Sequence, residues 1–304
     1  MKNILLYACL LCALAVNAPA NAQNKLPQLL LRLDDIGMNH SVNMAAEKFA
    51  KTGMPFSASV QFATPWYQEA VEILKKHPQV SVGVHLTLTS EWKNYRWGPI
   101  TGRTAVPSLV DTVGYFYQST DAFAKSGYKI EEVEKELSAQ IERALNSGLK
   151  ISYIDPHMGV ALSTPELRAL TEKLARKYKL AISTLSEVVY FHETYMEMWG
   201  EPVATKKRAF LKYVSTKLNP TRPNMVVIHV ALMGPEMDAL FDMNSDMMNT
   251  KAGKPLTSLH RQTELNMLLS PEFKAMVGKK FTLINYQQLL TGKDINTLTP
   301  LNNR

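Results

Sequence analysis

The chain has 304 residues, and its 34 Lys and Arg residues outnumber its 27 Asp and Glu residues to give a formal charge of +7. The basic residues are scattered instead of forming runs, which argues against a nucleic-acid-binding protein and indicates a solubilising surface with a mild preference for anionic surfaces or substrates. Both cysteines, Cys9 and Cys12, lie near the N-terminus. The rest of the chain can therefore form neither a disulfide nor a thiolate metal site.

The first 22 residues have the order of a cleavable secretory signal. Lys2 precedes an apolar stretch over residues 4–16, and Ala20-Asn21-Ala22 supplies the small residues of a cleavage site. The alternative is a membrane anchor, but the apolar run is shorter than the roughly 20 residues that span a bilayer. We therefore expect cleavage after Ala22, no stable membrane insertion, and a mature protein in the periplasm or outside the cell.

The remaining residues, 23–304, have a length that suits one domain. Seven short apolar runs that end in polar residues are expected to be strands, at 29–33, 57–60, 80–88, 151–154, 180–183, 225–230 and 281–284. Amphipathic stretches at 41–51, 66–76, 130–146, 165–178 and 258–269 are expected to be helices. This alternation predicts parallel strand pairing, and thus an α/β fold: a distorted (β/α) barrel of about seven strands.

Two segments interrupt the alternation. Residues 91–128 and 186–222 are rich in aromatic residues, and we interpret them as insertions after the third and fifth strands. In a β/α barrel the loops after the strands surround the active site. Both segments are therefore expected to overhang the face that carries the chemistry.

A pair of adjacent carboxylates, Asp34 and Asp35, ends the first expected strand. Two like charges side by side repel each other unless a cation compensates them, and a bound metal ion would do so. Adjacent side chains diverge at a strand end, so one carboxylate could bind the ion while the other faces a water molecule. The alternative is that Asp35, or Asn39, simply caps the following helix.

Three histidines, His85, His157 and His229, also stand where apolar runs end in polar residues. Each one alone could be a packed core residue, but in a barrel all three would converge on the face that holds the Asp pair. One carboxylate and two imidazoles suit zinc or another divalent ion with open positions. Asp34 could then accept a proton from the attacking water, and His229 could protonate the leaving group.

Four stretches resemble the YdjC-like carbohydrate deacetylases, which include the chitooligosaccharide deacetylases and are related to the polysaccharide deacetylases. They are the Leu-Arg-Leu-Asp-Asp-Ile-Gly-Met-Asn run at 31–39, the Gly-Val-His-Leu-Thr-Leu-Thr run at 83–89, the Ile-Asp-Pro-His run at 154–157, and the Arg-Gln-Thr-Glu-Leu run at 261–265. Two departures stand out. Gly159 and Val160 follow Met158 where the family often has further histidines, and His229 is followed by Val230 and Ala231 where the family often has Pro-Gly.

The resemblance implies a site and an activity. It makes Asp34 the base and places Asp35, His85 and His157 on one divalent ion, zinc or magnesium. We further expect Asp155 to support this cluster and His229 to act as the acid. The implied substrate is an oligosaccharide that loses an N-acetyl group.

The aromatic insertion and the late Arg-containing run provide candidate substrate contacts: Trp92, Trp97 and Arg261. Sugar rings stack on indole rings, although these tryptophans could equally pack the insertion against the barrel. Two other functions remain open, a metal-dependent hydrolase of a different amide or ester and a sugar-binding protein without turnover. Asp34 argues against the second, because a binder needs no base. The sequence leaves open whether the chain forms a homodimer.

Overall fold

The computed structural model describes residues 25–184, 188–190, 201–245 and 256–294. The expected signal segment, residues 1–22, lies outside these residues. Within them, no helix is both long enough and apolar enough to cross a membrane.

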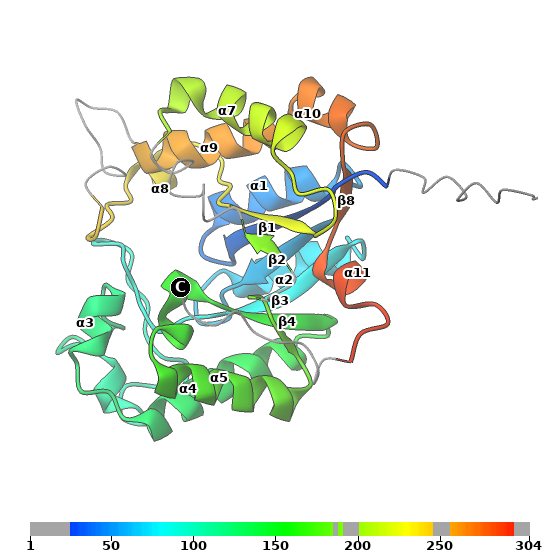
Figure 1. The fold of residues 1–304 in the computed structure, drawn as a ribbon. Helices are drawn as coiled ribbons and strands as arrows, with labels where there is room; N and C mark the ends of the chain where they lie inside the picture. Colours follow the sequence, from blue (N-terminus) through cyan, green and yellow to red (C-terminus); the bar gives the residue numbers. More distant parts are fainter. Residues whose placement is uncertain (1–24, 185–187, 191–200, 246–255, 295–304) are drawn as a thin grey trace, which may run out of the picture.

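A curved parallel sheet forms the centre of the molecule (Figure 1). Its strands are β1 (Gln28–Ile36), β2 (Phe56–Val60), β3 (Val80–Leu86), β4 (Ile151–Pro156), β5 (Ala181–Ile182), β6 (Val189–Tyr190), β7 (Asn224–Ile228) and β8 (Thr282–Ile284). Seven of them follow the order β5-β4-β3-β2-β1-β7-β6, and β8 pairs with β1. No pairing joins β5 to β6 among the described strands, so the barrel is incomplete. The predicted distorted (β/α) barrel of about seven strands is confirmed.

Strand β1 lies at the middle of this sheet because it is apolar toward both faces. Leu29, Leu30, Leu31 and Leu33 are fully buried, as expected for a parallel strand that is covered on both sides. Its residues pair with β7 along one edge, while β8 pairs with its beginning and β2 with its end. The C-terminal end of β1 is therefore held between two neighbours, which fixes the two carboxylates that it carries.

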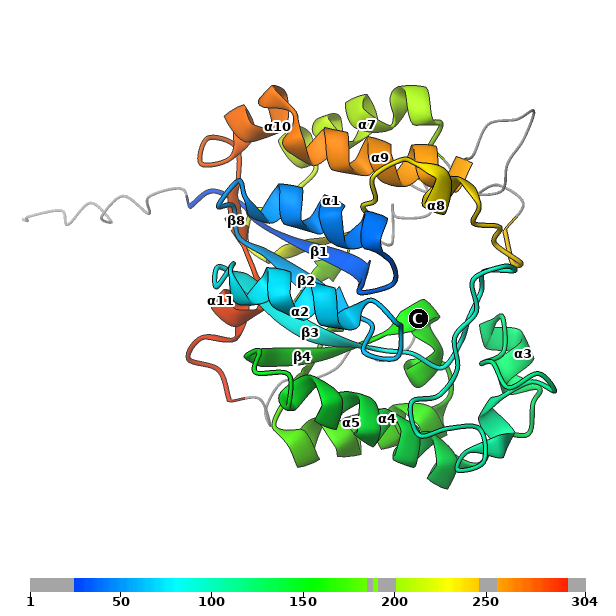
Figure 2. The ribbon, with the colours of Figure 1, turned by 180° about the vertical axis from the view of Figure 1, so that it is seen from behind.

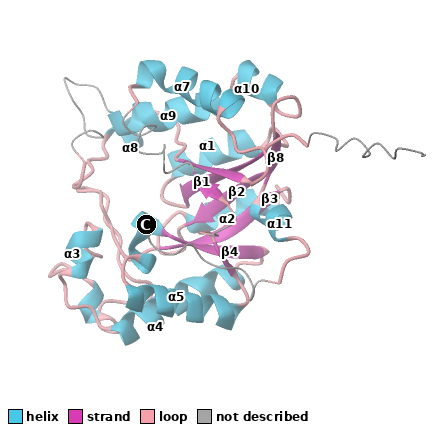
Figure 3. Cartoon of the chain, in the orientation of Figure 1, coloured by secondary structure: helices cyan, strands magenta, loops and turns pink. Residues whose placement is uncertain are grey.

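Helices cover the outside of the sheet (Figures 2 and 3). The longer ones are α1 (His40–Ala50), α2 (Tyr67–Lys75), α4 (Ile130–Leu145), α5 (Pro165–Tyr178), α7 (Val203–Thr216) and α9 (Leu256–Leu269), and the short ones are α3 (Thr120–Ala124), α8 (Pro235–Asp238), α10 (Pro271–Met276) and α11 (Tyr286–Leu290). Helices α7, α9 and α10 gather at one side, and α4 and α5 at the opposite side. All five helices expected from the sequence are present within two residues of their expected ends.

One of the two expected insertions is a regular part of the fold. Within residues 186–222, the described part forms β6 and α7, and β6 pairs with β7 in the parallel sheet. The interpretation as an overhanging loop is therefore wrong for this part. The two-residue strand is too short to give a periodic pattern, and α7 buries only a narrow face that contains Lys206, Phe210 and Val214.

The other insertion, residues 91–128, does extend over the sheet end. It contains one short 3-10 turn (Pro107–Leu109) and α3. Its beginning pairs with a distant segment in an antiparallel bridge between Trp92 and Asp242. The backbone N–H of Met243 donates to the carbonyl of Glu91 at 2.9 Å, and that of Lys93 donates to Phe241 at 2.9 Å. We call residues 91–93 and 241–243 the mouth ribbon.

Candidate active site

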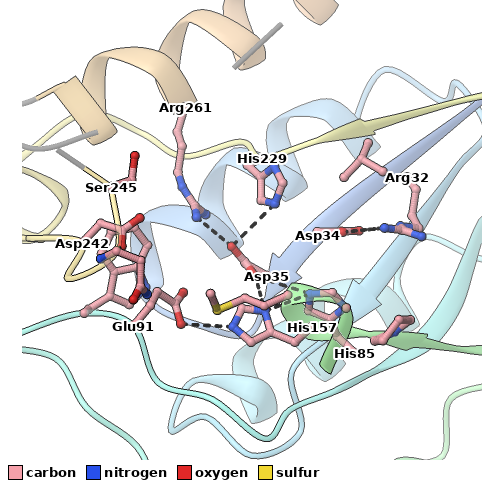
Figure 4. A pocket seen from close by; sticks show the side chains of 16 residues that line it. Arg32, Asp34, Asp35, His85, Glu91, His157, His229, Asp242, Ser245 and Arg261 are labelled. Atoms are coloured by element: carbon pink, nitrogen blue, oxygen red, sulfur yellow. Dashed lines mark hydrogen bonds and ion pairs between the residues drawn. The ribbon is translucent and has the colours of Figure 1, made fainter. Parts of the chain in front are cut away.

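Polar side chains from the C-terminal ends of β1, β3, β4 and β7 meet in one cavity of about 570 Å³ (Figure 4). The sequence singled out Asp34, Asp35, His85, His157 and His229, and all five line it. They converge because parallel strands end at the same edge of the sheet, which is where β/α folds carry their chemistry.

A local change in the backbone brings both adjacent carboxylates to this cavity. In a regular strand, Asp34 and Asp35 would point to opposite faces. Here Asp35 adopts a left-handed conformation with φ 62°, and the pairing with β2 shifts register between Leu33 and Ile36. Aspartate is one of the few side chains found often in this conformation, which costs roughly 1–2 kcal/mol. Gly37 follows with φ 93°, and a Cβ there would lie 3.1 Å from the Tyr67 backbone.

The helix cap considered as an alternative role for this segment belongs to Asn39. Its side chain accepts a hydrogen bond from Val42 N at the start of α1. The side chain of Asp35 instead points into the cavity (Figure 4). Capping therefore does not account for Asp35.

Three side chains form a compact donor cluster: Asp35, His85 and His157. Asp35 Oδ1 lies 3.5 Å from His85 Nε2 and 3.4 Å from His157 Nδ1, and the two ring nitrogens are 3.2 Å apart. Ligands at about 2.0–2.2 Å from one divalent ion are separated by roughly 3.0–3.5 Å. The residues present therefore fit a single ion.

A carboxylate lies behind His85, as the sequence led us to expect for Asp155. His85 Nδ1 is 2.7 Å from Asp155 Oδ2, an ion-pair distance whose direction is poor for a hydrogen bond. The other oxygen of Asp155 accepts a hydrogen bond from Ser183 Oγ at 2.5 Å and lies 2.6 Å from an Arg32 nitrogen. Asp155 is thus fixed by two partners and leaves His85 Nε2 free to face the cluster.

The charges of the cluster shift its pKa values. Burial alone would lower the pKa of His85 and of His157, but neighbouring carboxylates outweigh it. Asp34, Asp155 and Asp35 raise the pKa of His85 to about 9, and Glu91 and Asp35 raise that of His157 to about 10. Without a bound ion both histidines are therefore in the positively charged imidazolium form at neutral pH. A metal ion must displace one proton from each ring in order to bind.

Arg32, which was not expected from the sequence, balances the charges of Asp34 and Asp155. Its guanidinium makes a bidentate contact with Asp34, at 2.7 Å from Nε to Oδ1 and 2.8 Å from NH2 to Oδ2, and also contacts Asp155. Asp34, His85 and Asp155 form a second group of side chains that could hold an ion. Arg32 engages both of these carboxylates, whereas Asp35 directs its Oδ1 at the two histidines and pairs with an arginine only through its other oxygen. We therefore assign the ion to the Asp35 cluster. The signal was a single Arg within a run of leucines.

Two basic side chains approach Asp35 from the opposite side of the cavity. Arg261 NH2 donates to Asp35 Oδ2 at 2.7 Å, and His229 Nε2 is 4.0 Å from the same oxygen. Burial lowers the pKa of His229 to about 4, so this imidazole is neutral at pH 7. Its backbone N–H donates to Glu264 at 2.8 Å, and Glu264 pairs with the buried Lys206. These contacts hold the end of β7 against α9 and α7.

Arg261 has the placement expected for a substrate-binding residue, whereas the two tryptophans pack. Trp92 lines the cavity under the Arg261 guanidinium at 5.6 Å, but it is only 3% exposed. Trp97 is 4% exposed and donates from its ring nitrogen to the Thr89 carbonyl at 2.8 Å. Trp97 does not line the cavity. Both indoles are almost fully buried, which agrees with the packing alternative that the sequence left open.

Three further residues around the cluster were not found from the sequence. The Gln61 amide nitrogen lies 3.1 Å from Asp35 Oδ1 and 3.2 Å from His157 Nδ1. Glu91 Oε2 is 3.1 Å from His157 Nε2. Met158, directly after His157, lies at the rim with φ 50° and is 40% exposed. Gln61 directly follows a run assigned to a strand, which was an available signal, whereas Glu91 stands three residues beyond the run at 80–88.

Comparison with known proteins decides the family. A profile of the family described as "YdjC-like protein" matches residues 28–279. The chain belongs to the YdjC-like family. The match confirms the resemblance seen in the four sequence motifs.

Individual YdjC-like relatives agree with this membership. The chain is 28% identical over 273 residues to a protein of Enterococcus faecalis named carbohydrate deacetylase, covering 86% of this chain and 98% of that one. It is 32% identical to a carbohydrate deacetylase of Brevibacillus brevis over 51% of this chain and 58% of that one. A solved structure of a protein described as a putative cellobiose-phosphate cleavage protein, also from E. faecalis, superimposes with a TM-score of 0.64 at 25% identity. That match covers 87% of this chain and 99% of the solved one.

Proposed function

We propose that this protein is a metal-dependent hydrolase that removes an N-acetyl group from an oligosaccharide containing amino sugars. The observation that carries the proposal is the donor cluster of Asp35, His85 and His157 with Asp34 beside it in one cavity. Its YdjC-like relatives are named carbohydrate deacetylases, which supports the same chemistry. Hydrolysis cleaves the amide C–N bond, adds hydroxyl to the acetyl carbon and leaves a protonated amine on the sugar.

The donor set favours a first-row ion such as zinc over magnesium. Two of the three donor atoms are imidazole nitrogens, whereas magnesium prefers oxygen ligands. A bound zinc ion would supply Lewis-acid chemistry that polarises the carbonyl of the substrate. We propose one such ion per chain.

The side chains of this protein manage the protons. In the proposed reaction Asp34 takes up a proton from the attacking water, and its bidentate contact with Arg32 fixes the direction of the carboxylate. We assign proton donation to His229, which lines the opposite side of the cavity. Because His229 is neutral at pH 7, it must take up a proton during the reaction before it can pass one to the departing amine. Arg261 lines the cavity, and its Nε and one terminal nitrogen, NH1, have no hydrogen-bond partner among the described residues, so we assign it to substrate binding.

Acetate release tests this activity. The mature chain, stripped of metal and reloaded with zinc, is incubated with N-acetylated oligosaccharides of several sugars and lengths. We expect acetate and free amine in equal amounts from at least one of them, and release that is slower by roughly two to four orders of magnitude from the Asp34→Asn variant. If the loaded protein binds one ion but releases no acetate from any of them, the hydrolase acts on another amide or an ester. If the protein binds these sugars without turning any of them over, the alternative of a non-catalytic sugar-binding protein would be favoured instead.

We further propose that the protein is exported, on the grounds of the signal-like first 22 residues. Cell fractionation of the full chain and of a chain that starts at residue 23 would test this. The full chain should appear outside the cytoplasm at a size that matches cleavage after Ala22. Cytoplasmic retention of both forms would contradict it.

A further inference from the structure

The two histidines of the donor cluster face it with different ring nitrogens. His85 directs Nε2 toward the cluster, whereas His157 directs Nδ1. The rings are nearly perpendicular, with centroids 5.0 Å apart and an interplanar angle of 73°. Each ring therefore has a second nitrogen that points away from the cluster and needs its own partner.

Both of these outer nitrogens face a buried carboxylate. Asp155 lies behind His85, as described above, and Glu91 lies behind His157 at 3.1 Å from Nε2. Glu91 is 5% exposed. Within the described residues, His157 is the hydrogen-bond and ion-pair partner found for the Glu91 side chain. The Glu91 carboxylate therefore contacts the histidine without also pairing with an arginine. The Asp155 carboxylate, in contrast, pairs with Arg32 as well.

The proton position on His157 follows from this contact. A neutral imidazole carries one N–H, and the carboxylate of Glu91 accepts a hydrogen bond only if that proton is on Nε2. The lone pair of Nδ1 is then directed at Asp35 and His85. A ring without Glu91 could place its proton on Nδ1 or rotate, and either change would remove a donor from the cluster.

Glu91 reaches this place through the mouth ribbon. Its carbonyl accepts a hydrogen bond from Met243 N at 2.9 Å, and the next residue, Trp92, forms the bridge with Asp242. Asp242 lines the same cavity as His157. The backbone at Glu91 is thus anchored by residues 241–243, about 150 residues later in the chain, and not by a strand of the central sheet.

We propose that Glu91 is a positioning residue that holds His157 in the orientation and tautomer in which Nδ1 faces the metal ion. This inference rests on the proposed function, because it requires an ion at the donor cluster. Carboxylates behind ligating histidines commonly contribute about 10–100-fold to metal affinity. Glu91 would act through His157 without contacting the ion.

Zinc affinity tests this role without measuring turnover. The mature protein is stripped with a chelator and titrated with zinc against a chromophoric competitor, for the unchanged chain, Glu91→Gln and Glu91→Ala. We expect Glu91→Ala to weaken zinc binding by about 10–100-fold. Glu91→Gln, which keeps the shape and an acceptor oxygen but loses the charge, should give a smaller loss.

A matched control separates positioning from general stability. Glu132 anchors the same insertion by accepting two hydrogen bonds from Ser108, each at 2.8 Å, and does not line the cavity. Glu132→Gln should therefore lower the melting temperature while changing zinc affinity by less than about 2-fold. Long-range ¹H–¹⁵N spectra of the histidine rings give a second readout. In the zinc-loaded unchanged chain the proton of His157 should be on Nε2, and the Glu91 variants should lose this single state.

The outcomes separate this inference from the proposed function. Glu91 variants that remain folded and bind zinc within about 2-fold of the unchanged chain would overturn the role of Glu91. If Glu91→Ala does not fold, the near-isosteric Glu91→Gln decides by the same criterion. If His85→Ala and His157→Ala keep full zinc affinity, the metal cluster itself is wrong.

Discussion

The two histidine ligands proposed here are supported by different parts of the molecule. His85 is backed by Asp155, which lies on β4 of the sheet and is tied to Arg32 and Ser183. His157 is backed by Glu91, which lies in the insertion and is anchored by the mouth ribbon. The sheet thus provides one half of the site with fixed geometry, while the other half depends on how a loop folds over it. Changes in the two halves should have different consequences.

The largest effect is expected from the donors themselves. The mature protein should carry about one divalent ion per chain, because three donor atoms converge on one point. Replacing His85 or His157 by Ala removes one donor and should abolish this binding, which elemental analysis of the purified variants measures. Full occupancy in both variants would refute the cluster.

The second-largest effect is expected from replacing Asp34, the proposed proton acceptor. Asp34→Asn retains the shape of the carboxylate but cannot accept a proton, so turnover should fall by roughly two to four orders of magnitude. The ion should remain, since Asp34 is outside the donor cluster. Steady-state kinetics together with metal analysis on the same sample check both statements. Unchanged kinetics would contradict the role of Asp34 as the base; Asp155, the alternative that the sequence offered, lies behind His85 and does not line the cavity.

The insertion can be tested through its two buried tryptophans. Trp97→Ala should destabilise the protein by about 3–5 kcal/mol, because it removes a large side chain that is 4% exposed. Since Trp97 does not line the cavity, the preference for oligosaccharide length should not change. Trp92→Ala should additionally weaken substrate binding, because Trp92 lines the cavity beneath Arg261.

Chemical denaturation and KM values for short and long oligosaccharides distinguish these two outcomes. A chain-length effect in Trp97→Ala with intact stability would contradict the packing role and restore the stacking role expected from the sequence.

The smallest effect is a pH dependence of stability in the protein without metal. The folded-state pKa values of His85 and His157, about 9 and about 10, lie above their ordinary value of 6.5. Groups with raised pKa values stabilise the fold fully below the unfolded pKa, and this contribution is lost as the pH rises through the folded pKa. The melting temperature of the chelated protein should therefore fall between about pH 6.5 and pH 10.

Zinc replaces these protons, so the loaded protein should show a smaller decrease over the same pH range. Differential scanning calorimetry of both forms measures the difference. A melting temperature of the chelated form that rises across this interval would contradict the proposed protonation state of the two histidines.

The sequence predicted the sheet half of the site better than the insertion half, for a physical reason. Asp34, Asp35, His85, His157 and His229 each follow an apolar run, and in a parallel sheet that position alone places a residue at the active-site edge. Arg32 contacts Asp34, two residues away, but its second partner, Asp155, lies more than 100 residues away. No local pattern reveals such a pair.

For the insertion, no comparable rule links the position of a residue in the sequence to its position at the active site. Glu91 reaches His157 only because the mouth ribbon joins residues 91–93 to residues 241–243, and no periodicity in either segment indicates that pairing. The same lack of periodicity left open whether Trp97 is an exposed stacking residue or, as the structure has it, a buried one. Likewise β6, with two residues, was too short to be found, so α7 was taken for part of a loop.

The most direct test of a metal-dependent deacetylase is to measure its activity as metal is added. Chelator-stripped mature protein is titrated with zinc while acetate release from an N-acetylated oligosaccharide is followed. We expect no activity in the stripped protein, and activity that rises until one ion per chain is bound; His85→Ala should show no such rise. Acetate release at the full rate by the stripped protein, or by His85→Ala without bound metal, would contradict it.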